Sequence, residues 1–186
     1  MVKLTDTTAF PAATSLQDDA AFYTVDDSTG TPVDKSIQIQ HLVAHNRHFA
    51  SIHVTGATAS QSVSADTYTK LTAFTTNGLA NGATAVYGSD KISTTKTGIY
   101  KVQYSLSVYT GTAATVHAAV YAGGSIQNTG GTSAGKIEAG FTQQIGGVAY
   151  IDVTTAATDI EIYMKSTHTA FIVAEGVLTI ERVMNT

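Results

Sequence analysis

The 186-residue sequence contains no cysteine and no tryptophan. The absence of cysteine excludes disulfides, cysteine-ligated zinc, iron–sulfur clusters and thiol nucleophiles. Charged side chains are scarce, because they make up 13% of the residues against about 25% in a typical domain. The formal net charge is −4, and a protein that follows nucleic-acid phosphates normally carries a basic face. We therefore expect no nucleic-acid partner.

Long apolar runs are also missing. No segment approaches the roughly 18 continuous apolar residues of a membrane span, and the first ten residues, MVKLTDTTAF, lack the apolar run of a signal peptide. We expect no membrane partner and assembly in a cytoplasm. Hydrophobic residues nevertheless reach 43%, enough for a core, and threonine is the most abundant polar residue. Threonine favours the pleated surface of a sheet, so the composition predicts an all-β protein.

The first 50 residues differ in character from the remainder. Both prolines lie there, and acidic side chains outnumber basic ones. The stretch AFYTVDDSTGTPVDKSIQIQHLVAHN predicts two short strands around a DDSTGTP turn, followed by one or two helical turns. It holds too few apolar residues to fold alone. We predict that residues 1–50 form an extended arm that binds either the following domain or another chain.

Residues 51–186 alternate strand signals with turn signals, which is typical of a sandwich or barrel. The clearest strand runs from Ile99 to Tyr109, with apolar residues on one face and polar residues on the other. NGLANG at 77–82 predicts a loop or hairpin, TYTKLTAF at 67–74 a strand, and KIEAGFTQQI at 136–145 another strand. The predicted fold class is all-β, a jelly-roll β-sandwich preceded by the N-terminal arm.

Three segments carry a family resemblance: TGIYKVQYSLSV, VYAGGSIQ and VLTIERV. Their order over residues 52–184 resembles the trimeric jelly rolls of the tumour-necrosis-factor and complement-globular-head type. The resemblance implies a homotrimer. No collagen stalk or heptad repeat precedes the domain here, so the domain or the arm has to hold the trimer together.

The arm has a resemblance of its own. Its Asp-rich strand, turn, lysine and I-x-I strand resemble the N-terminal segment of tailed-phage structural proteins, with the matching positions at Val25, Asp26, Lys35, Ile37, Ile39 and Leu42. This resemblance implies a virion component whose arm docks onto the major capsid protein or other virion proteins. The side chains expected to be buried in that attachment are Phe22, Val25, Ile37, Ile39 and Leu42.

Four histidines cluster at His41, His45, His48 and His53. On a helix, the first three would share a face and could ligate a metal, or they could line a trimer axis and respond to an anion or to pH. An HExxH pattern is absent. We favour polar histidines at a joint, and we predict neither a metal nor a cofactor.

No carboxylate pair predicts catalysis. Asp18–Asp19 and Asp26–Asp27 lie in turn-like sequence without calcium-loop spacing. Asp159 and Glu161 alternate on one strand face, which is more typical of a solvated face than of a glycosidase cleft. A GxSxG elbow and a phosphate loop are absent. The sequence therefore predicts a protein that is not an enzyme.

The outward-facing residues favour contact with other chains. They are Ser, Thr, Gln and Ala rather than Lys and Glu, which suits packing against neighbouring copies. Tyr109, Tyr121 and Tyr163 fall off the core faces and are candidates for the trimer interface, with ordinary sheet-surface tyrosines as the alternative.

We predict a structural protein of a tailed-phage virion, located on the capsid surface as a decoration, cement or head-fibre protein that stabilises the shell. The alternative is a tail-fibre tip or adhesin that recognises a host surface sugar or protein. A secreted lectin or signalling ligand is a third possibility, disfavoured by the missing signal peptide.

Overall fold

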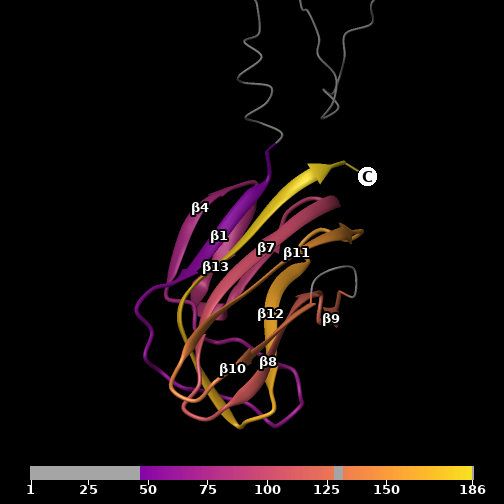
Figure 1. Ribbon diagram of the computed structural model, residues 1–186. Helices are drawn as coiled ribbons and strands as arrows, with labels where there is room; N and C mark the ends of the chain where they lie inside the picture. The colour runs from indigo at the N-terminus through magenta and orange to yellow at the C-terminus, as the bar shows by residue number, and fades with distance from the viewer. Residues whose placement is uncertain (1–46, 128–131, 186) are drawn as a thin grey trace, which may run out of the picture. The chain divides into compact units, whose positions relative to one another are not determined.

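The computed structural model describes residues 47–127 and 132–185 (Figure 1). Apart from a 3-10 turn at Tyr87–Ser89, the regular elements in these ranges are β-strands, as the composition predicts. None of the helical structure in the described ranges is long and apolar enough to cross a membrane. The attachment residues predicted for the arm, and two of the clustered histidines, lie outside the described residues: Phe22, Val25, Ile37, Ile39, Leu42, His41 and His45.

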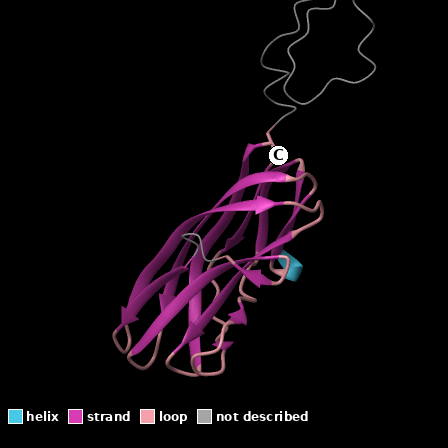
Figure 2. Cartoon of the chain, turned by 90° about the vertical axis from the view of Figure 1, so that its right-hand side faces the viewer, coloured by secondary structure: helices cyan, strands magenta, loops and turns pink. Residues whose placement is uncertain are grey.

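The strands form two antiparallel sheets packed face to face, which confirms the jelly-roll sandwich (Figure 2). The first sheet has the order β11-β7-β13-β1-β4, with β2 beside β13; its strands are β1 (Phe49–Val54), β2 (Gln61–Ser62), β4 (Thr76–Asn81), β7 (Gly98–Tyr109), β11 (Thr142–Val153) and β13 (Ala170–Met184). The second has the order β10-β8-β12-β6-β5, with β3 beside β12 and β9 beside β8; its strands are β3 (Thr69–Lys70), β5 (Ala83–Val86), β6 (Lys91–Thr94), β8 (Ala114–Ala122), β9 (Ser125–Ile126), β10 (Thr132–Ile137) and β12 (Asp159–Ser166).

The core lies between the sheets and follows the two-residue period of each strand. Along β7 the inward residues are almost fully buried, as the alternation from Ile99 to Tyr109 predicts: Tyr100, Val102, Tyr104, Leu106 and Val108. From the facing sheet, β12 contributes Ile160, Ile162 and Met164. The buried hydroxyl of Tyr104 lies 2.8 Å from the Ser133 Oγ and donates to the Ala118 carbonyl, so a polar contact joins the two sheets within the apolar layer.

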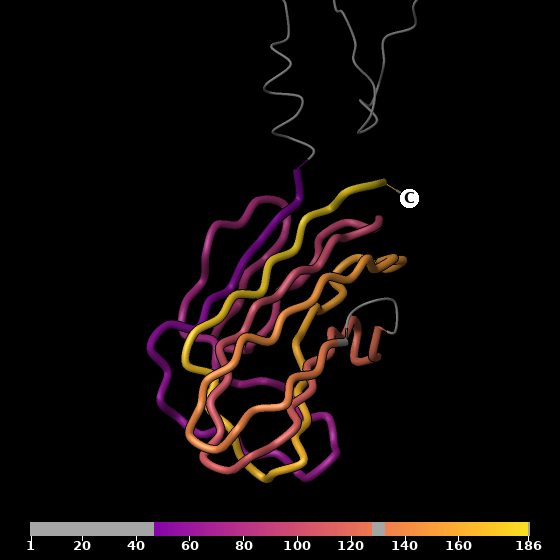
Figure 3. Tube along the Cα trace, in the orientation of Figure 1, coloured from indigo at the N-terminus to yellow at the C-terminus, as the bar shows by residue number. Residues whose placement is uncertain are grey.

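The two ends of the sandwich differ (Figure 3). The start of β1 pairs with the end of β13, Phe49 opposite Glu181, so the described chain enters and leaves at the same end. The β7–β8 and β12–β13 turns lie at the opposite end. The start of β1 and the end of β13 therefore lie at one end of the sandwich.

The prediction of a loop or hairpin at NGLANG is wrong for most of the segment, because Thr76–Asn81 forms β4, an edge strand paired with β1, and the next strand, β5, belongs to the other sheet. Gly78 explains the difference. A Cβ at this position would overlap Ser51 Oγ and His53 Nε2 on the neighbouring strand, so glycine permits a close approach of the two strands here. The turn comes one step later, at Gly82, whose φ of +65° favours glycine.

Two predicted strands are also shorter or divided. In TYTKLTAF only Thr69–Lys70 pairs as a strand; the chain then departs while Leu71 and Phe74 fill the core. In KIEAGFTQQI a turn at residues 138–141 separates β10 from β11, and the chain crosses from the second sheet to the first. Gly140, with φ of +79°, lies in this turn. Local alternation continues through both segments and does not show where the chain changes sheet.

Candidate functional site

The outer side of the first sheet carries few charges, and we call it the sheet-1 face. Its positions alternate with the buried core positions along β1, β7, β11 and β13. Lys101 stands opposite Glu181, and most of the other side chains are uncharged. The strand positions that compose the sheet-1 face are Phe49, Ser51, His53, Ile99, Lys101, Gln103, Ser105, Ser107, Tyr109, Thr142, Gln144, Gly146, Val148, Tyr150, Asp152, Ile172, Glu175, Val177, Thr179 and Glu181.

Both edges of the first sheet are nearly uncharged as well. On β11 the only charged residue is Asp152, while Val148 is 40% exposed and Tyr150 57% exposed. On β4, at the other edge, all six residues are uncharged and Leu79 is 81% exposed. Monomeric proteins usually blunt sheet edges with lysine, proline or a covering segment. A low-charge face between two such edges suits burial against another protein.

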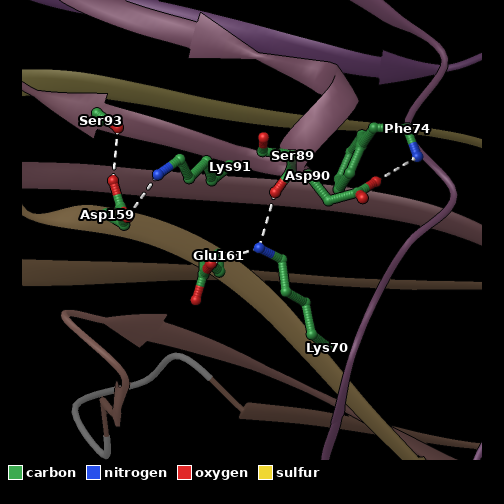
Figure 4. Close-up of polar contacts among 8 residues, drawn as sticks. All are labelled: Lys70, Phe74, Ser89, Asp90, Lys91, Ser93, Asp159 and Glu161. Carbon is green, nitrogen blue, oxygen red and sulfur yellow. Dashed lines mark hydrogen bonds and ion pairs between the residues drawn. The ribbon is translucent and has the colours of Figure 1, made fainter.

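The outer side of the second sheet carries more charges, and two of its lysines are paired with carboxylates (Figure 4). Lys70 Nζ lies 2.5 Å from the Glu161 carboxylate and also donates to the Ser89 carbonyl at 2.7 Å. Next to this pair, Asp90 accepts a hydrogen bond from the Phe74 amide at 3.1 Å. Burial raises the pKa of Asp90 despite that hydrogen bond and the attraction of Lys70. These contacts fix the crossover after β3 against the 3-10 turn.

A second ion pair lies beside the first. Lys91 Nζ lies 2.8 Å from the Asp159 carboxylate, which also accepts a hydrogen bond from Ser93 Oγ at 2.5 Å (Figure 4). Burial acts to raise the pKa of Asp159, but the hydrogen bonds and the lysine charges outweigh it, so this pKa is lowered. The hydrogen bond to Asp159 correspondingly raises the pKa of Lys91. The acids predicted to form a solvated face, Asp159 and Glu161, are thus both ion-paired.

Three tyrosines gather on the same outer side, and we call Tyr68, Tyr121 and Tyr163 the tyrosine cluster. The rings of Tyr121 and Tyr163 stack with centroids 3.8 Å apart and planes 20° apart, and Tyr68 lies 6.2 Å from Tyr121 at 59°. Lys165 Nζ lies 5.2 Å from the centre of the Tyr68 ring. Ala119 stands opposite Tyr163 in the register and is fully buried, so this small residue lies beneath the rings.

The three tyrosines predicted for the trimer interface do not share one surface. Tyr109 lies on the sheet-1 face, whereas Tyr121 and Tyr163 stack on the outer side of the second sheet. A ring of copies uses two different surfaces of each protomer, so trimer contact stays a prediction for each tyrosine. Tyr109 also lines a shallow, mainly apolar hollow at the end of the sandwich, together with Ser60, His168 and Ile172.

Two of the four clustered histidines, His48 and His53, lie in the described residues. His48 directly precedes β1 and is not helical, and its Nδ1 lies 2.7 Å from the Gly82 carbonyl oxygen. His53 Nε2 lies 3.1 Å from Ser51 Oγ on the same strand. The predicted helical face that would align His48 with the two upstream histidines therefore does not extend to it. No group of three or more potential metal ligands occurs in the ranges 47–127 and 132–185.

Sequence reasoning missed the assembly around the tyrosine cluster. Alternation in TYTK and EIYMK places Tyr68, Lys70, Glu161, Tyr163 and Lys165 on outward faces. It does not show that β3 pairs with β12, and that pairing brings the two segments together. The available signal was the Tyr-x-Lys pattern, which occurs at 68–70 and again at 163–165. Nothing in this pattern shows that the two segments pair with each other.

No family model and no curated protein matches the sequence, whereas solved structures match the fold. Eiger TNF from S. frugiperda superposes with a TM-score of 0.55 and 12% identity, over 75% of this chain and 95% of that one. The globular domain of the zebrafish complement 1qA protein gives 0.52 and 6%, over 75% and 99%. Murine APRIL gives 0.51 and 13%, over 73% and 99%.

The chain has the jelly-roll fold of the tumour-necrosis-factor and complement globular heads. The sequence resemblance therefore predicted the fold correctly. At identities of 6–13% the likeness extends to the fold alone, and one fold of this kind serves many functions. The role of this jelly roll has to be argued from its surfaces.

Proposed function

We propose that the protein is a self-associating structural head on the surface of a tailed-phage virion, of the capsid-decoration or head-fibre type. The observation that carries the self-association is the sheet-1 face with its two nearly uncharged edges. Leu79, Val148 and Tyr150 are exposed on the edge strands. Such side chains favour aggregation of a monomer, whereas their burial stabilises an interface between subunits. Virion attachment rests on the resemblance of the arm to tailed-phage structural proteins.

The arrangement of the exposed groups favours a ring of copies. Val148 and Leu79 lie on opposite edges of one sheet, so the two apolar edges of a protomer are different surfaces. When unlike surfaces meet head to tail, a closed ring forms if the rotation closes. The homotrimer implied by the sequence resemblance is such a ring, and burial of about 800 Å² per protomer would make each contact a standard interface.

Self-association is tested by placing a charge on the edge strand. We expect the unmodified chain to have three times its 19.3 kDa mass by light scattering at micromolar concentration, and Val148→Lys to give a monomer. The substituted lysine would carry its charge into an interface that lacks a partner for it. Thr84→Lys, on an exposed position of β5 in the second sheet, is the matched control and keeps the trimer. A monomeric unmodified chain contradicts the proposal.

The arm supplies attachment in this proposal. The part of the predicted arm that precedes β1 binds the major capsid protein or another virion protein and buries Phe22, Val25, Ile37, Ile39 and Leu42 there. One arm alone binds weakly, but three arms on one trimer gain avidity because the second and third attach at high effective concentration. The trimer then clamps adjacent capsomers.

Attachment is tested by truncation ahead of β1, which begins at Phe49. A chain without residues 1–46 is expected to keep the circular dichroism of a β-sandwich and to stop sedimenting with virions. The full-length chain, added to virions that lack the protein, sediments with them. Particles that are still decorated by the truncated chain would refute the role of the arm.

The second candidate function is a receptor-binding head at a tail-fibre tip. The observation that favours it is the tyrosine cluster, which lies on the sheet opposite the sheet-1 face and stays accessible when that face is buried. Immunogold labelling of purified virions with an antibody against residues 48–186 separates the two functions. Gold over the head supports decoration, and gold at the tail tip supports receptor binding.

A further inference from the structure

We propose that the tyrosine cluster, together with the lysines Lys165 and Lys136 and with His117 on the same outer side, is a binding surface for an acidic saccharide, a pyranose that carries a carboxylate. The inference rests on the second candidate function, a receptor-binding head, and does not depend on attachment to the capsid. It is carried by three features of the outer side of the second sheet: ordered rings, basic residues without an acidic partner, and strands whose main chain is already paired.

The rings are ordered before any ligand arrives. Tyr163 is held against Tyr121 by stacking, and Tyr68 is tilted toward Tyr121 on the other side. The buried Ala119 seats them on the sheet, since a larger side chain there would lift the rings. Aromatic side chains held in this way add little entropy cost on binding. Their apolar rings pack against the C–H face of a sugar, and their hydroxyls can hydrogen-bond to its oxygens.

The basic residues on the same outer side as the rings lack acidic partners. Lys165 stands opposite His117 in the β12–β8 register, and His117 stands opposite Ala134 in the β8–β10 register. Lys136 is two residues along β10 from Ala134 and lies on the same outer side. Lys70 and Lys91, on the same sheet, are ion-paired, whereas no carboxylate in the described ranges pairs with Lys165, His117 or Lys136.

Two side chains that can donate hydrogen bonds lie next to each other at this place. Lys165 and His117 stand directly opposite each other on neighbouring strands. A carboxylate between them offers the lysine an opposite charge and offers both side chains a hydrogen-bond acceptor. The basic residues therefore specify an acidic ligand, and the rings specify a ligand with a flat apolar face.

The main chain at the cluster favours a sugar over a peptide strand. β8 lies between β10 and β12, and β12 is paired with β8 on one side and with β3 and β6 on the other. Their backbone groups are already hydrogen-bonded, so a peptide cannot add as a further strand at the cluster. Recognition there has to come from rings and side chains, which is how a saccharide is bound.

Binding is tested on the full chain with ring-labelled tyrosine and nuclear magnetic resonance. The probes are a hyaluronan tetrasaccharide and sialyllactose as acidic sugars, chitotetraose as a neutral sugar, and sodium acetate and inorganic phosphate as bare anions. We expect the acidic sugars to shift the ring signals of Tyr68, Tyr121 and Tyr163 and to leave Tyr109 and Tyr150 in place. The bare anions and the neutral sugar should bind at least about tenfold more weakly, since each offers only one of the two features.

Two variants locate the site. Lys165→Glu is expected to weaken the acidic sugars about tenfold or more, while Lys96→Glu, which introduces the same charge change in a loop away from the cluster, has no effect. Tyr163→Phe keeps the stacked ring and removes only its hydroxyl, which also hydrogen-bonds to Glu161, so it tests what this hydroxyl adds to sugar binding. Thermal unfolding of each variant shows that it is folded.

The inference is overturned if neither acidic sugar shifts the three rings at millimolar concentration. Equal binding of the acidic and neutral sugars, or equal binding by Lys165→Glu and the unmodified chain, also overturns it. None of these outcomes changes the mass measured by light scattering or the position of the immunogold label on the virion, which are the tests of the proposed function. A failure of this inference is thus distinguishable from a failure of the proposed function.

Discussion

Asp90 shows how a single residue can reduce stability while it shapes a turn. It has a left-handed backbone with φ of 51° at the end of the 3-10 turn, and its carboxylate accepts the Phe74 amide. Burial raises its pKa, so the ionised form is less favourable in the folded chain than in the unfolded chain. The cost is absent at low pH, grows as pH rises above about 3.9, the unfolded value, and is complete once pH exceeds the raised pKa.

We predict that Asp90→Asn raises the melting temperature at pH 7 and leaves it nearly unchanged at pH 3. Asparagine tolerates the left-handed backbone and keeps an oxygen that accepts the Phe74 amide, but it has no charge to desolvate. The measurement is thermal unfolding by circular dichroism at the two pH values. Asp66→Asn is the control, because Asp66 has a similar φ of 56° and is exposed. A lower melting temperature for Asp90→Asn at pH 7 would show that its attraction to Lys70 outweighs burial.

At the scale of the element, the sequence predicts strands well where a single face is buried. The run from Ile99 to Tyr109 alternates without interruption and forms β7 almost residue for residue. At NGLANG the prediction from local sequence was wrong, because Asn-Gly pairs normally mark turns. The strand conformation of this segment is set by close contact with Ser51 and His53 across β1, which no local pattern records. Tertiary packing therefore overrides the local turn preference in β4.

Gly78 provides the corresponding test. We expect Gly78→Ala to lower the unfolding free energy by about 1 kcal/mol or more, because the added methyl group displaces Ser51 Oγ and His53 Nε2 and strains the β1–β4 pairing. Gly88→Ala is the matched control, since a Cβ there has nothing within 4 Å. Urea unfolding of both variants measures the difference. Equal stability of the two alanine variants would mean that the contact at β4 relaxes freely.

At the scale of the whole molecule, the sequence predicted a surface of low charge but did not show which residues belong to which of the two outer sheet surfaces. The low charge of the polar positions predicted packing against other chains, and the structure concentrates that low charge on the first sheet. Tyr121 and Tyr163 were grouped with Tyr109, although they lie on the other sheet. A strand sequence shows which residues point outward, but only the pairing order shows which of the two outer surfaces they occupy.

The two surfaces are expected to respond differently to salt, which is the last prediction. Contact through the sheet-1 face relies on apolar burial, which salt does not screen, so the trimer mass should stay constant between about 0.05 and 0.5 M sodium chloride. Binding of an acidic sugar relies on exposed lysines, and its affinity should fall over the same range. Light scattering and the tyrosine ring shifts measure the two responses in the same samples. A trimer that dissociates as salt rises would place its main contacts among the charged groups of the second sheet instead.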